Sequence, residues 1–107
     1  MFKERLELYD QVAALCNRFE RKGKTSPYTS ANGYMFSFLN KAAELGFRFS
    51  KEVQENYFDK YETTYYKSHN SVMKGHILIT DKMLEDKDLL VSLLNESYDY
   101  VMSLEPK

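Results

Sequence analysis

Tyr28, Arg48, Lys74 and His76 are the residues whose types and spacing best suit a binding site for an anion. Alternation along the strand expected over 72–79 puts Met73, Ile77 and Ile79 on one face, and Lys74 and His76 on the other. Arg48 likewise opposes the phenylalanines that flank it. We therefore expect Arg48, Lys74 and His76 to share the helix-free face of a sheet near Tyr28, where they accept an anionic ligand or a partner's acidic residues. An ordinary solvated sheet surface is the alternative.

The other reactive residues form no known catalytic or metal-binding motif. Gly23-Lys24-Thr25 resembles the end of a phosphate-binding loop, but Arg18 stands where that loop needs its first glycine, and a helix precedes it instead of a strand. His69, expected in a loop, and His76, expected on a sheet surface, form no zinc cluster with Cys16. Cys16 lies on an apolar helical stripe, where burial disfavours the thiolate. The sequence predicts no metal and no cofactor, and it favours a protein that is not an enzyme.

The balance of charges argues against nucleic acid as a partner. Lys and Arg number 15 against 16 Asp and Glu, giving a formal net charge of −1, so no overall field attracts a polyanion. The basic stretch Arg18–Lys24 precedes Tyr28, a combination that suits single-stranded nucleic acid. Cations at the C-terminus of a helix, however, already have a local electrostatic reason to be there. We therefore do not expect nucleic-acid binding.

The sequence also predicts the compartment and the number of domains. One cysteine cannot form an internal disulfide, and the chain opens on a charged amphipathic segment instead of an apolar leader. No apolar run approaches the ~20 residues that cross a bilayer. We expect a cytoplasmic protein without membrane contact. With 43% hydrophobic residues, residues 1–107 are expected to form one domain with a real core.

Hydrophobic periodicity predicts an α+β fold with the order α-β-β-β-α-β-β-α and an antiparallel sheet. The expected elements are a helix over 2–19 that Gly23 stops, a short strand around Tyr28, a turn at Asn32-Gly33, an aromatic-faced strand over 34–39, a strand over 45–49, a helix that Ser50 caps and that reaches Tyr61, a hairpin of 63–66 with 72–79, and a last helix that Thr80 or Asp81 caps. The first and last helices carry the longest apolar stripes, so we expect them to cover one face of the sheet.

Several segments resemble the N-terminal domain of the TfoX/Sxy family. They are Asn32–Phe36, Gly46–Ser50 at the start of a helix, Met73–Ile79 and the ending Ser97–Lys107. The resemblance covers the chain from about Leu6 onward and implies an α+β fold with an antiparallel sheet and flanking helices. The family is named after a bacterial regulator of DNA-uptake competence. We do not expect that regulator's separate C-terminal domain here, so the resemblance does not imply a competence role. It also implies no catalytic residues.

Two functions are consistent with these patterns. The preferred one is a small non-enzymatic binding or regulatory module whose sheet surface contacts a protein partner or a second copy of the chain, because exposed aromatic residues are costly to leave in water. The alternative is a binder of a small anionic ligand, or an enzyme acting on one, that uses Arg48, Lys74 and His76 with Tyr28 nearby.

Overall fold

Five antiparallel strands form one open sheet, and four helices accompany it in the computed structural model, which describes residues 1–107. The elements are α1 (Phe2–Cys16), β1 (Tyr28–Ala31), β2 (Tyr34–Leu39), β3 (Leu45–Arg48), α2 (Lys51–Lys60), β4 (Tyr65–Ser68), β5 (Ser71–Leu78), α3 (Asp81–Leu84) and α4 (Lys87–Met102). The strand order across the sheet is β1-β2-β3-β5-β4. The predicted α+β class and element order are confirmed, with α3 as one addition.

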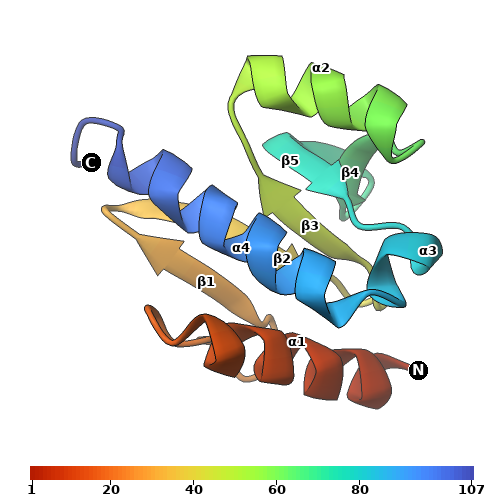
Figure 1. The fold of residues 1–107 in the computed structure, drawn as a ribbon. Helices are drawn as coiled ribbons and strands as arrows, with labels where there is room; N and C mark the ends of the chain where they lie inside the picture. The colour runs from red at the N-terminus through yellow and green to blue at the C-terminus, as the bar shows by residue number, and fades with distance from the viewer.

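Helix α4 crosses in front of β2 and β3 in Figure 1, with α1 on one side of it and α2 on the other. Leu45, Phe47 and Phe49 are fully buried and point to this helical face, as their alternation predicts. The α1 residues Tyr9 and Val12 join the same core. The first and last helices therefore do cover one face of the sheet.

The opposite face is covered in its centre by a tyrosine. Gly46 alternates with Leu45 and Phe47, so a side chain there would point away from the helices, and a Cβ atom would lie only 2.2 Å from the ring of Tyr66. Tyr66 is fully buried, and its hydroxyl lies 2.8 Å from the carbonyl oxygen of Glu44, to which it donates. The helix-free face is therefore closed at this point.

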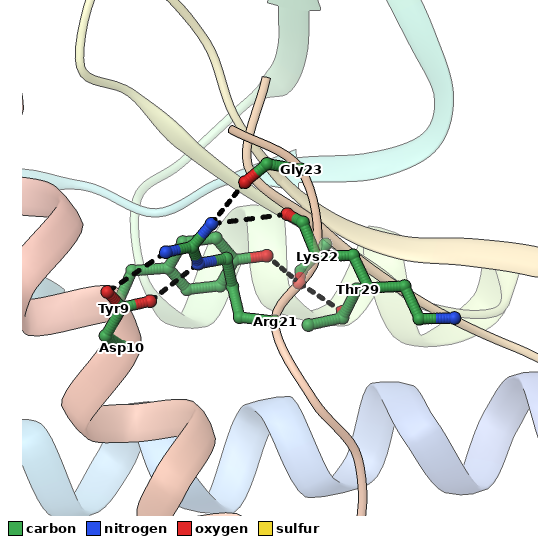
Figure 2. A network of polar contacts seen from close by, with 7 residues as sticks. Tyr9, Asp10, Arg21, Lys22, Gly23 and Thr29 are labelled. Carbon is green, nitrogen blue, oxygen red and sulfur yellow. Dashed lines mark hydrogen bonds and ion pairs between the residues drawn. The ribbon is translucent and has the colours of Figure 1, made fainter. Parts of the chain in front are cut away.

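Helix α1 ends earlier than the sequence predicts. Asn17 adopts the left-handed conformation (φ 55°), and its N–H donates to the carbonyl of Ala13, so the helix stops at Cys16 and not near Gly23. The basic stretch Arg18–Lys24 therefore follows the helix in a loop, and none of its residues lies in the last turn of the helix. Arg21 holds this loop against α1 through both oxygens of Asp10 (Figure 2).

Both predicted hairpins are present. Asn32 and Gly33 have positive φ angles and join β1 to β2, while His69 and Asn70 do the same between β4 and β5. The expected aromatic face of β2 is interrupted, because the register between β1 and β2 shifts at this point. As a result, the neighbouring residues Phe36 and Ser37 are both fully buried, and the simple alternation is lost.

The side chain of Asn32 ties the first hairpin to the last helix. Its Nδ2 donates to the carbonyl oxygens of Val101 (2.8 Å) and Leu104 (2.9 Å). Val101 lies in the last turn of α4, and Leu104 follows shortly after the helix. The turn between β1 and β2 thus caps α4.

Two helices stand where the sequence predicted one. Thr80 caps α3 by accepting from the N–H of Met83, and Asp86 caps α4 by accepting from the N–H of Leu89. The cap predicted at Thr80 is thus confirmed, but a second cap at Asp86 restarts the helix.

Candidate functional site

The structure brings three of the four predicted site residues together. Arg48 at the end of β3 and His76 on β5 are direct cross-strand partners. Lys74 precedes His76 on β5, and its carbonyl oxygen is 3.1 Å from His76 Nδ1. Tyr28 does not join them, because it lies on β1 and pairs with Phe38, three strands away from β5 in the sheet.

A groove of about 440 Å³ lies beside Arg48 and Lys74. The two residues line it from the sheet, and further walls come from α2 and from one residue of α4. The full lining is Arg48, Phe49, Lys51, Gln54, Glu55, Phe58, Tyr65, Val72, Lys74, Gly75 and Tyr100. Helices α2 and α4 contribute residues to this groove, so Arg48 and Lys74 meet beside helices and not on an open sheet surface.

Positive charge predominates in this groove. Arg48, Lys51 and Lys74 each carry a positive charge at neutral pH, whereas Glu55 is the only acidic residue in the lining. No carboxylate of the protein forms an ion pair with any of the three cations. The groove therefore offers three cations to an incoming anion and opposes them with one carboxylate.

Arg48 is held in place without being neutralised. Its guanidinium carbon is 5.4 Å from the centre of the Tyr34 ring, a cation–π contact that leaves the charge in place. Its Nε is buried and has no hydrogen-bond partner within the protein. The side chain passes over Gly75, where a Cβ atom would lie 3.3 Å from Nε, and the positive φ of Gly75 (86°) also favours glycine there.

His76 is buried, which corrects the prediction of a sheet-surface histidine. Only 3% of its surface is exposed, because the helix-free face that it points to is covered by Tyr66, whose ring centre is 6.2 Å from that of His76. Burial, together with the nearby charge of Arg48, lowers the pKa of His76 to about 4. The imidazole is therefore neutral at neutral pH and adds no charge to the groove.

The rim of the groove is apolar where β4 and β5 meet α2. Tyr65 and Val72 expose 55% and 52% of their surface, and both line the groove. The Tyr65 ring centre is 5.0 Å from that of Phe58 on α2, so the aromatic surface continues from the rim to the wall. Sequence reasoning missed Lys51, Phe58, Tyr65, Val72 and Tyr100 as members of the site. The one available signal was the high β-propensity of residues 63–66, which placed Tyr65 on a strand.

The groove lining contains no cysteine, serine, threonine or histidine. Cys16 lies elsewhere, in the core, and burial raises the pKa of its thiol to about 11. No three His, Cys, Asp or Glu side chains lie close enough together to hold a metal ion. The groove can bind by charge and by apolar contact.

None of the helices combines the length and apolar character that a membrane span requires. No protein-family description, curated protein or solved structure matches this chain. The resemblance to the TfoX/Sxy family and the cytoplasmic location both stay predictions.

Proposed function

We propose that this chain is a non-enzymatic binding module and that its binding site is the groove between α2 and β5, which accepts an anionic group. The observation that carries the proposal is the state of Arg48, a partly buried arginine without an ion pair in a groove that also contains Lys51 and Lys74. Buried charges in proteins are usually paired, because removing an unpaired charge from water is costly. An anion from outside the chain is the partner that this setting lacks.

The alternative of catalysis has less support. His76 was the one residue among the predicted four with a pKa suited to proton transfer near neutral pH, and burial moves that pKa to about 4. Its Nε2 is inaccessible to solvent. Binding without catalysis needs neither a base nor a nucleophile, and it uses the cations that the groove does present.

A ligand series measured by thermal unfolding and calorimetry tests the proposal. Inorganic phosphate, benzoate and phenyl phosphate are compared with neutral benzamide. We expect the anions to stabilise the fold, by about 1.4 kcal/mol at a ligand concentration ten times Kd, and benzamide to have little effect. Arg48→Met and Lys74→Met should each weaken the stabilisation, whereas the matched variant Lys24→Met, an exposed lysine outside the groove, should not. Equal responses to anions and to benzamide, or unchanged responses in both groove variants, contradict the proposal.

A further inference from the structure

The three cations of the groove come from three different elements. Arg48 ends β3, Lys51 begins α2, and Lys74 lies on β5. Arg48 is partly buried, whereas Lys51 and Lys74 are exposed. A compact anion bound at Arg48 satisfies the most buried cation first, and the exposed lysines remain available to further negative charges.

The apolar rim lies at the outer edge of the sheet. β4 is the last strand in the sheet order, so Tyr65 stands at an edge where no further strand follows. Val72 lies on the neighbouring strand, opposite Lys67 in the ladder. Together these two side chains form an exposed apolar surface that continues to Phe58 on α2. Exposed apolar surface next to a charged groove is typical of a protein-interaction site.

We propose, on the basis of the function proposed above, that the natural occupant of this groove is a short acidic peptide segment of a partner protein, with carboxylates on both sides of a large apolar residue. The carboxylates pair with Arg48 and the exposed lysines, because the groove opposes its three cations with Glu55 alone. The apolar residue covers Tyr65 and Val72. A small anion satisfies the charges but leaves this rim in water.

Fluorescence anisotropy with three short labelled peptides tests this inference. The first has an Asp-Phe-Asp core, the second replaces both acids to give Asn-Phe-Asn, and the third replaces the apolar residue to give Asp-Ser-Asp. We expect the Asn peptide to bind at least about tenfold more weakly than the first, and the Ser peptide about fivefold more weakly. Affinity for the Asp-Phe-Asp peptide should fall as salt is raised, because Lys51 and Lys74 are exposed and their charges are screened.

Variants assign each part of the peptide to its contact. Arg48→Met and Lys74→Met should weaken binding of the Asp-Phe-Asp peptide but should change the affinity for the Asn-Phe-Asn peptide little. Val72→Ser, a substitution at an exposed position, should weaken binding of the Asp-Phe-Asp peptide and leave the affinity for the Asp-Ser-Asp peptide unchanged. Lys24→Met serves as the control for each measurement, and circular dichroism confirms that every variant is folded.

The results that overturn this inference differ from those that overturn the proposed function. If small anions bind through Arg48 while Phe-to-Ser replacement and Val72→Ser change nothing, the occupant is a small anion and only the peptide inference fails. If neither small anions nor peptides bind, both proposals fail. If the wild-type chain sediments as a dimer that Arg48→Met dissociates, the occupant is a second copy and the peptide inference is wrong.

Discussion

Arg21 and Arg48 present the same guanidinium group in two different surroundings, one beside α1 and the other beside α2. Arg21 donates to both oxygens of Asp10 and to the carbonyl oxygens of Lys22 and Gly23 (Figure 2). Arg48 has no carboxylate partner, and its Nε has no hydrogen-bond partner at all. An arginine whose donors are satisfied inside the chain stabilises the fold, whereas one without an ion pair is available to a ligand.

The polar groups around the two arginines differ in the same way. Beside Arg21, the hydroxyls of Tyr9 and Thr29 both contact the hydroxyl of Ser37 in a buried chain. Beside Arg48, the imidazole of His76 is equally buried, yet its Nε2 has no partner. Buried polar groups are nearly always paired in folded proteins, and two of the three unpaired buried side-chain atoms are Arg48 Nε and His76 Nε2, the third being Ser97 Oγ on α4. The following predictions test this difference.

The largest effect is expected from acid acting on His76. The pKa of this residue is about 4 in the folded chain and 6.5 in the unfolded chain, so the unfolded chain binds the proton first as the pH falls. The contribution of neutral His76 to the free energy of unfolding is complete above pH 6.5, falls as the pH decreases toward 4, and changes no further below pH 4. At 1.36 kcal/mol per pKa unit, the free energy of unfolding decreases by about 3 kcal/mol. Urea unfolding at a series of pH values measures it.

The second histidine provides the control for this measurement. His69 is exposed in the turn between β4 and β5. His69→Gln should keep the pH dependence of the wild type, and His76→Gln should remove most of it between pH 6.5 and 4. Equal slopes in the wild type and His76→Gln would show that other groups cause the acid sensitivity.

The next effect comes from interrupting the hydroxyl chain beside α1. Ser37→Ala leaves the hydroxyls of Tyr9 and Thr29 buried without their common partner, and we expect a loss of about 2 kcal/mol in the free energy of unfolding. The triple variant Tyr9→Phe, Ser37→Ala and Thr29→Val removes all three hydroxyls, so it should recover part of this loss. A triple variant less stable than Ser37→Ala would show that the hydroxyls stabilise by more than satisfying one another.

A smaller effect is expected from Arg21. Arg21→Met removes the contacts to Asp10 and to the loop carbonyls, and since this pair is partly exposed we expect a loss of about 1 kcal/mol. Proteolysis within residues 17–27 should accelerate as well, because the loop is held to α1 through these contacts. A loop that stays equally resistant in the variant would mean that Arg21 does not hold it.

The smallest effect on stability is expected from Arg48. Arg48→Met removes a charge without an ion pair and a buried Nε without a partner, so the free energy of unfolding should change by no more than about 0.5 kcal/mol. The same variant should lose affinity for anions. If it loses stability as Arg21→Met does, the distinction between the two arginines fails.

Local patterns predicted most of the fold because they depend on neighbouring residues. Alternation placed Leu45, Phe47 and Phe49 on one face, and the Asn32-Gly33 pair marked the first turn. The end of α1 was misplaced because asparagine, like glycine, adopts positive φ, and Asn17 occurs before Gly23. Nothing in the sequence around Asn17 distinguishes it as the stop.

The candidate site was predictable only in part, because contacts between distant residues create it. Strand parity selected Arg48 and Lys74 correctly as neighbours, and the structure places both in one groove. The alternation of residues along β5 also predicted an exposed His76. That alternation contains no information about Tyr66, which covers the face to which His76 points. Tyr65 joins the groove only because the β4–β5 hairpin packs against α2.

The bond between Asn32 and the end of α4 affects how this chain matures on a ribosome. The turn that contains Asn32 is made 69 residues before Val101, its acceptor. At the usual rate of 5 to 20 residues per second, this interval is roughly 3 to 14 seconds. Strands β1 and β2 are therefore synthesised well before the helix that covers them, and the first hairpin cannot complete its packing until residues 87–102 have been made.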